Sequence, residues 1–270
     1  SCLNSFHGRT LFTVSVGGQP KYSKDYAPLP QGITYVPFNN IAALEAAISE
    51  NTCAVIIEPI QGESGILPAT QEYLQAARRL CDKHGALLIL DEVQTGMGHT
   101  GKLFAYEHYG ITPDILSSAK ALSGGFPIGA ILTTDKIAPT FGPGTHGSTF
   151  GGNPMACAVG SRAFDIINAP ETLAHVEKQG QKFQTTLREL GEKTGVFKEV
   201  RGMGLLIGCV LADKYQGRAS EITAAALKHG LMVLVAGSDV VRFAPSLLLN
   251  DEDMAEGLKR LEAALTEWIV

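Results

Sequence analysis

An acidic residue and a lysine stand 29 positions apart, and each directly follows an apolar run. Asp91 follows ALLIL (86–90), and Lys120 follows DILSSA (114–119). A carboxylate at the end of a buried strand is partly desolvated and needs a cationic or hydrogen-bonding partner. A desolvated lysine has a lowered pKa and becomes a nucleophile toward aldehydes. Alone, each residue is an ordinary ion-paired or solvated side chain. Together they indicate an aldehyde cofactor whose ring nitrogen needs an acid, which is pyridoxal phosphate.

The segments before Asp91 predict a unit that could position it. An apolar run at 53–57 ends at Glu58, an amphipathic helix is predicted over 71–84, and the strand 86–90 follows. This order predicts a right-handed βαβ unit in a parallel sheet that is buried on both faces. Ligands of such sheets collect outside the carboxyl ends of the strands, so Glu58 and Asp91 are expected at the same edge.

The rest of the chain alternates strands and helices. Further strands are predicted over 114–119, 128–134, 205–211, 231–237 and 240–246, and further helices over 41–49, 154–168, 171–194, 219–229 and 251–268. Asn153 and Pro154 are a typical N-cap and first turn for one of these helices. We therefore expect an α/β fold with part of a large domain over 1–172 and a small α+β domain over 173–270.

Composition excludes several classes of function. The 270 residues are 45% hydrophobic and 18% charged, which excludes a disordered chain. The net charge of −5 argues against a nucleic-acid partner, and the absence of an apolar stretch of about 18 residues argues against a membrane span. Seven histidines without ligand spacing indicate no metal site, and five scattered cysteines without a CxxC pair indicate reduced, mostly buried thiols of a cytoplasmic protein.

Six motifs occur in a fixed order: SFHGRT (5–10), EPIQGE (58–63), DEVQTG (91–96), AKAL (119–122), HGSTFGGNP (146–154) and VRFAP (241–245). In this order and spacing the chain resembles the class III (subgroup II) pyridoxal-phosphate aminotransferases over its whole length. Within that class, residues 6–23 and 201–211 are most similar to the bacterial acetylornithine and succinylornithine aminotransferases. The resemblance implies a fold-type I architecture, with a mostly parallel sheet, flanking helices and a smaller C-terminal α+β domain.

The resemblance also implies the cofactor contacts. Lys120 resembles the lysine that forms the Schiff base with pyridoxal 5′-phosphate and later moves the proton. Asp91 would keep the pyridine nitrogen protonated, Gln94 would bond the ring 3′-oxygen, and Phe6 would stack on the ring. The other implied cofactor contacts are His7, Val93, Ser148 and Thr149. Thr149 resembles the residue that bonds the phosphate in the partner subunit, so a homodimer with a shared active site is expected.

Two arginines resemble the carboxylate-binding residues of this class. Arg9 and Arg242 would each bind a substrate carboxylate through a planar guanidinium. Glu63 resembles the partner that covers Arg242 when an amino substrate enters and releases it for 2-oxoglutarate. For both arginines, a structural salt bridge is the alternative.

The resemblance implies transfer of the terminal amine of N-acetylornithine or N-succinylornithine to 2-oxoglutarate, giving glutamate, in arginine metabolism. Other class III specificities (ornithine, 4-aminobutyrate or succinyl-diaminopimelate) are alternatives. So is an inactive remnant, because about a third of the family's usual length would precede Ser5. Ser64 and Ser123 replace glycines of the family pattern, and they would be strained if these sites need positive φ.

Overall fold

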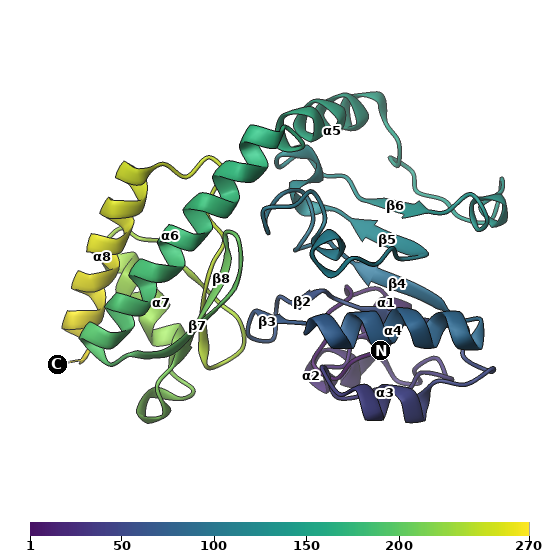
Figure 1. Cartoon of the computed structure of the whole chain (residues 1–270), viewed down its shortest axis with the longest axis horizontal. Helices are drawn as coiled ribbons and strands as arrows, with labels where there is room; N and C mark the ends of the chain where they lie inside the picture. The colour runs from purple at the N-terminus through teal and green to yellow at the C-terminus, as the bar shows by residue number, and fades with distance from the viewer. Residues whose placement is uncertain (270) are drawn as a thin grey trace. The chain divides into compact units, whose positions relative to one another are not determined.

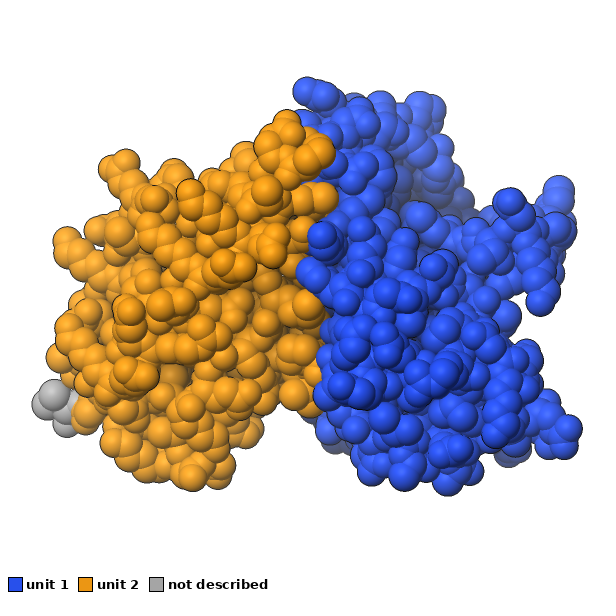
Figure 2. All heavy atoms as spheres, in the orientation of Figure 1, with its two compact units in different colours: residues 1–59, 69–97, 102–168 blue, residues 60–68, 98–101, 169–270 orange. Residues whose placement is uncertain are grey.

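The computed structural model describes residues 1–269, which form two compact units (Figures 1 and 2). Unit 1 comprises Ser1–Pro59, Ala69–Met97 and Lys102–Asn168. Unit 2 comprises Ile60–Pro68, Gly98–Gly101 and the described residues from Ala169 onward. A boundary between residues 172 and 173 that separates a large from a small domain stays a prediction.

Unit 1 is built on a four-stranded sheet in the order β1-β4-β5-β6. The strands are β1 (Ala54–Ile57), β4 (Leu87–Asp91), β5 (Ile115–Ser118) and β6 (Ala130–Thr133). The pairs β1–β4 and β4–β5 are parallel, and β6 runs antiparallel to β5. The predicted mostly parallel sheet is therefore confirmed, as are the parallel strands on either side of the helix over 71–84.

The two faces of this sheet differ in burial. Val55, Ile57, Leu88 and Leu90 are buried, while the residues that alternate with them in β1 and β4 are mostly half-buried. Helix α4 (Gln71–His84) packs against β1 and β4 and accounts for the buried face. Among residues 1–269 the prediction of burial on both faces is not met, because side chains of the other face, such as Ile56 and Ile89, are half-buried and line a cavity.

Local sequence signals explain the longer helices of unit 1. The side chain of Thr70 accepts a hydrogen bond from the Tyr73 N–H at 3.1 Å, and Gly85 ends α4 in the left-handed region at φ 70°. The predicted helix over 71–84 is confirmed. Asn153 caps the next long helix in the same way, as predicted. The helices of unit 1 are α1 (Leu11–Val16), α2 (Pro20–Ser23), α3 (Ile41–Ala47), α4 and α5 (Pro154–Ile167), with 3₁₀ turns η1 (Lys24–Tyr26), η2 (Ala105–Tyr109), η3 (Lys120–Ser123) and η4 (Ala138–Thr140).

Unit 2 is an antiparallel sheet with three helices. The sheet order is β7 (Phe197–Met203), β8 (Leu206–Leu211), β10 (Val240–Phe243) and β9 (Leu234–Val235). The helices are α6 (Pro170–Thr194), α7 (Ala219–Lys228) and α8 (Asp251–Ile269), with one 3₁₀ turn η5 (Asp213–Tyr215). Every residue of β8 is buried. Ile207, Cys209 and Leu211 share a core with α6 and α8, whereas Leu206 and Val210 pack in a second cluster with Ile60 and Ile66. A hairpin of β2 (Ile60–Gln61) and β3 (Leu67–Pro68) completes the unit.

Two strands of unit 2 differ from expectation. The strand predicted over 231–237 is only Leu234–Val235, because only those two residues pair with β10. Strand β7 was not predicted. Its sequence FKEVRGM is charged, its register shifts between Phe197 and Glu199, and so its burial does not alternate.

Candidate active site

Asp91 ends β4 in a pocket of hydrogen-bond donors. Its Oδ1 accepts from the Val93 N–H at 3.1 Å and from the Ser117 hydroxyl at 3.0 Å, and its Oδ2 lies 2.8 Å from His7 Nδ1. Asp91 is only 8% exposed. Burial alone would raise the pKa of this carboxyl, but the hydrogen bonds and the charge interaction with His7 lower the pKa below its ordinary value. Asp91 is thus a buried carboxylate that stays ionised.

The segment before α1 meets the carboxyl ends of β1 and β4. Ile57 pairs with Leu90, so the residues that follow them, Glu58 and Asp91, stand side by side at one edge. The Phe6 N–H donates to Glu58 Oε2 at 3.0 Å. The His7 side chain is 2% exposed, and among residues 1–269 its Nε2 has no hydrogen-bond partner. The structure therefore gathers the predicted Phe6, His7 and Asp91 at this edge.

Lys120 begins the turn that follows the neighbouring strand. Asp91 pairs with Ser117 of β5, and Lys120 comes three residues later, at the same edge of the sheet. Its backbone lies in the left-handed region at φ 49°, which costs a non-glycine residue about 1–2 kcal/mol. Strained backbone of this kind is concentrated at functional sites. The lysine side chain is exposed.

Aromatic rings support the predicted Arg9. The rings of Phe6 and Tyr22 meet edge to face with centroids 5.5 Å apart. The Arg9 guanidinium lies 4.7 Å from the Tyr22 centroid and 6.0 Å from that of Phe6. Such cation–π contacts orient a guanidinium and leave its N–H groups available. Arg9 is itself exposed, so it could bind an anion from solvent.

The loop after β4 carries Val93 and Gln94, both half-buried. Glu92 holds this loop: it accepts from the Thr95 hydroxyl at 2.5 Å and from the N–H groups of Ala105 and Tyr106, both at 2.8 Å. Burial raises the pKa of Glu92 to about 7, despite these donors. This role of Glu92 was not predictable from the sequence, because the motif DEVQ shows a second acid but not its hydrogen-bond partners.

Ser148 and Thr149 lie on an exposed segment between β6 and α5. Within the described residues, their side chains make no hydrogen bond to the other predicted site residues. Their predicted role in binding a phosphate stays a prediction.

In unit 2, Arg242 and Glu63 form an ion pair. Arg242 Nη1 lies 2.8 Å from Glu63 Oε1 and also donates to the Gly62 carbonyl at 3.3 Å. The two side chains are 13% and 29% exposed, so the pair is only partly desolvated. Glu63 stands in the β2–β3 hairpin, where Gly65 has φ 108° and the β-branched Ile66 has φ 50°. Strain in this turn must be balanced by contacts around it.

Arg201 of β7 supplies such a contact. Its Nε and Nη2 donate to the Gly65 carbonyl at 2.9 and 2.8 Å. Arg201 was not predicted as a site residue. The only available signal was its place in the segment 201–211, which does not reveal a partner 136 positions away.

Ser64 and Ser123 are not strained. Neither is among the non-glycine residues with positive φ within residues 1–269, whereas the neighbouring Gly65 and Gly124 are in that region. The serines therefore occupy positions that an L-residue adopts without cost, and the expected strain does not arise.

A cavity of about 630 Å³ in unit 1 includes His7, Asp91 and Ser117 in its lining. Apolar side chains of the sheet, among them Ile56 and Ile89, form much of the remainder. A cavity lined by apolar side chains and a few polar groups is typical of a cofactor or substrate site.

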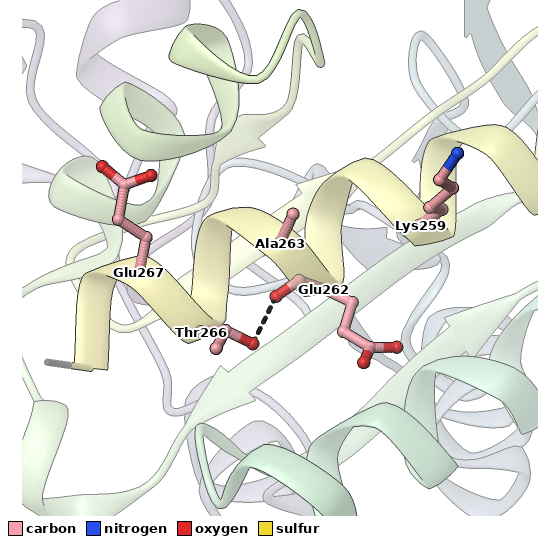
Figure 3. A pocket seen from close by; sticks show the side chains of 5 residues that line it. All are labelled: Lys259, Glu262, Ala263, Thr266 and Glu267. Carbon is pink, nitrogen blue, oxygen red and sulfur yellow. Dashed lines mark hydrogen bonds between the residues drawn. The ribbon is translucent and has the colours of Figure 1, made fainter.

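Among residues 1–269, those that line a hollow of about 700 Å³ in unit 2 all belong to α8: Lys259, Glu262, Ala263, Thr266 and Glu267 (Figure 3). The Thr266 hydroxyl donates to the Glu262 carbonyl at 2.8 Å, an ordinary bond within a helix. This surface contains none of the predicted site residues.

Among the residues described, no helix is long and apolar enough to cross a membrane, and no three His, Cys, Asp or Glu side chains gather as a metal site would require. All five cysteines are free, and three are buried.

Comparisons with known proteins identify relatives of the chain. The family described as aminotransferase class-III matches residues 1–265. The chain is 83% identical over 268 residues to an acetylornithine aminotransferase of Neisseria meningitidis, covering 99% of this chain and 67% of that protein. It is 58% identical to a succinylornithine transaminase/acetylornithine aminotransferase of Pseudomonas aeruginosa, covering 98% of this chain and 66% of that protein.

Among solved structures, the N-acetylornithine aminotransferase from Stenotrophomonas maltophilia superposes with a TM-score of 0.83 at 46% identity. The match covers 88% of this chain and 63% of that one. The chain thus spans about two thirds of the length of the relatives it matches.

Proposed function

The chain belongs to the class-III aminotransferase family, and on that premise we propose that it transfers the terminal amine of an N-acylornithine, acetylated or succinylated, to 2-oxoglutarate. We propose pyridoxal 5′-phosphate as its cofactor. One observation carries the proposal: a buried, ionised Asp91 stands beside the strand that leads to Lys120. The names of the similar proteins support the choice of substrate.

The donors and acceptors around Asp91 fit a pyridine ring that bears an aldehyde. Asp91 is an anion whose Oδ2 has one protein partner, so it can accept a further N–H. The side chains of His7 and Asp91 line the same cavity. Phe6, the residue before His7, supplies an aromatic ring, and its N–H donates to Glu58 at the same strand ends. An amine, Lys120, follows the adjacent strand. A cation-binding acid, a ring and an amine are the groups that this cofactor requires.

When bound, the cofactor supplies an electron-withdrawing ring and an aldehyde carbon that takes up the amine. The protein's own part is the control of protons. The Asp91 carboxylate would hold a proton on the ring nitrogen, since a nearby anion favours the charged form. The Lys120 Nζ would remove and return a proton at the substrate carbon that bears the amine, as a general base and then a general acid.

We propose Arg9 and Arg242 as the residues that bind substrate carboxylates. A guanidinium that pairs with a half-exposed carboxylate can exchange it for a ligand carboxylate of the same charge. The Arg242–Glu63 pair has this character, so Glu63 would cover Arg242 for the amino substrate and leave it for 2-oxoglutarate.

The assembly is a further part of the proposal. The exposed Ser148 and Thr149, next to Phe150 at 80% exposure, would be covered in a homodimer and bind a phosphate there. We further propose glutamate as the product, a role in arginine metabolism and a cytoplasmic location. The family match along residues 1–265 does not favour an inactive remnant.

The test uses the purified chain and the cofactor. Wild type should acquire the absorption band of the bound cofactor near the blue edge of the visible. In a single turnover, acetylornithine or succinylornithine should remove this band faster than ornithine or 4-aminobutyrate does. Lys120→Ala should lack the band, while Lys136→Ala, an exposed lysine of the same unit, should keep it. A wild-type chain without the band would refute the proposal.

A further inference from the structure

The two oxygens of Asp91 have different surroundings. Oδ1 accepts two hydrogen bonds, from the Val93 N–H and the Ser117 hydroxyl, while Oδ2 faces only His7 Nδ1. We propose that Ser117 is a positioning residue: it fixes the Asp91 carboxylate so that, among the contacts of residues 1–269, Oδ2 is the oxygen left to accept the N–H of the cofactor ring. This inference rests on the proposed function and names the residue that sets the orientation of its acid.

The acceptor capacity of a carboxylate supports this choice. An ionised carboxylate has about four acceptor sites, two on each oxygen. Val93 and Ser117 fill those of Oδ1, and His7 fills one of Oδ2, so one site is left and it is on Oδ2. Without the Ser117 hydroxyl, Oδ1 would have an unfilled acceptor site. The carboxylate would then lose one of the hydrogen bonds that prevent its rotation.

The position of Ser117 is fixed by the sheet itself. Ser117 pairs with Asp91 across β4 and β5, and the Glu92 N–H donates to the Ser117 carbonyl at 3.0 Å. Main chain and side chain therefore tie the two strands together at the same point. Because Lys120 follows Ser117 by three residues, this tie also fixes the strand end that carries the lysine relative to the acid.

The next residue offers a matched control. Ser118 lies in the same strand and is 2% exposed, but its hydroxyl has no hydrogen-bond partner among residues 1–269. Ser117→Ala and Ser118→Ala remove the same atom from neighbouring positions, and only the first removes a bond to Asp91. Ser117→Thr keeps the hydroxyl and should restore the wild-type behaviour.

The experiment measures the Asp91 carboxyl directly, by carbon-13 NMR of aspartate-labelled protein without added cofactor. Asp91→Asn identifies the resonance. The titratable groups at this edge of the sheet are His7, which lies 2.8 Å from Oδ2, and Glu58, Glu92 and Lys120 at the strand ends. Ser117→Ala should raise the Asp91 pKa by about one unit, since a hydrogen bond to the ionised form is lost. Ser118→Ala and Ser117→Thr should leave the pKa at the wild-type value.

A second readout uses the loaded protein. In Ser117→Ala the absorption of the bound cofactor should change with pH at a lower pH than in wild type, because the ring nitrogen loses its proton more easily. An Asp91 pKa equal in Ser117→Ala and Ser118→Ala would overturn the role of Ser117 alone. Failure of the wild type to bind the cofactor would overturn the proposed function, and with it the assignment of Oδ2 to the ring.

Discussion

The two units hold their acidic residues in opposite ways. In unit 1, Asp91 is 8% exposed and three donors from three separate segments hold it. In unit 2, Glu63 is 29% exposed at its side chain, has Arg242 as its charged partner, and stands in a turn with a strained Ile66. The first arrangement resists any change of position or charge, while the second is a partly solvated pair whose separation costs less.

This difference matches the two tasks that the proposed reaction sets. A group that holds a proton on a resident cofactor must stay in place through every cycle, and preorganised, buried electrostatics serve that purpose. A group that must accept two different substrates in turn has to give up its internal partner each time. The contrast predicts that changes in unit 1 affect the rate of the chemistry, whereas changes in unit 2 affect the binding of one substrate.

The largest effect is expected for Asp91→Asn. A neutral amide cannot hold the ring proton, so single-turnover rates with acetylornithine should fall by about 10²–10³-fold. Stopped-flow absorption of the loaded protein measures this rate. Asp135→Asn, an exposed acid of the same unit, should change it little. A loss no larger than that of the control would break the contrast between the units.

A smaller and more selective effect is expected for Arg242→Lys. The lysine keeps the charge but loses planar, bidentate binding, so the KM for 2-oxoglutarate should rise about 10–100-fold. The rate of the half-reaction with acetylornithine should stay near wild type. Arg260→Lys, whose ion pair on α8 is exposed, serves as the control in steady-state assays. Equal losses for both substrates would show that Arg242 is structural.

Arg201→Ala should loosen the hairpin that carries Glu63. Two hydrogen bonds to the Gly65 carbonyl are lost, so amide hydrogen exchange over 60–68 should become about 10-fold faster. Mass spectrometry of peptides from that hairpin measures the change. Arg218→Ala, which removes an exposed pair with Glu221, should leave these peptides unchanged. Unchanged exchange in Arg201→Ala would mean that the hairpin is held by other contacts.

The smallest effect concerns the pH dependence of stability, in which Glu92 and Asp91 of unit 1 are expected to act in opposite directions. The folded pKa of Glu92, about 7, lies above its ordinary 4.5, so the folded protein binds more protons than the unfolded chain between these values. Stability from this residue is therefore present below pH 4.5 and is lost as the pH rises to about 7, at up to about 1.4 kcal/mol per pH unit. Asp91, with a lowered pKa, acts in the opposite sense, and loses its contribution only on acidification.

Glu92→Gln tests the pH-dependent stability that Glu92 contributes. The variant should be less stable overall. Its side-chain NH₂ would face one of the backbone N–H groups, of Ala105 or Tyr106, that donate to Glu92, and two donors cannot form a hydrogen bond. Its free energy of unfolding in urea should vary less with pH between 4.5 and 7 than that of wild type. An identical slope in both proteins would contradict a raised pKa for Glu92.

Much of the fold could be predicted from local patterns. The helix at 71–84 has a clear amphipathic period, a threonine cap and a terminal glycine, and it forms with the predicted bounds. Strand β7 could not be found in this way, because its charged residues and register shift remove the alternation. The open face of the unit 1 sheet was also missed, because an apolar run shows that a strand can be buried but not which elements cover it.

The site was predictable as a set of residue types but not as a network. Asp91 and Lys120 could be found from strand ends and from family motifs. The role of Ser117 depends on a register between two strands, and that of Arg201 on a contact between residues 136 positions apart. Short-range sequence patterns predict neither contact, because residues that meet only in the folded chain have no characteristic spacing in the sequence.

The central claim is that Asp91, as a buried carboxylate, keeps a proton on the nitrogen of a bound pyridine ring. Nitrogen-15 NMR of the chain loaded with ring-labelled pyridoxal 5′-phosphate measures that proton directly. In wild type the nitrogen shift should be that of a protonated ring at neutral pH and above, and in Asp91→Asn it should move to that of the neutral ring. A neutral-ring shift in the wild-type protein, or the same shift in both proteins, would contradict the account.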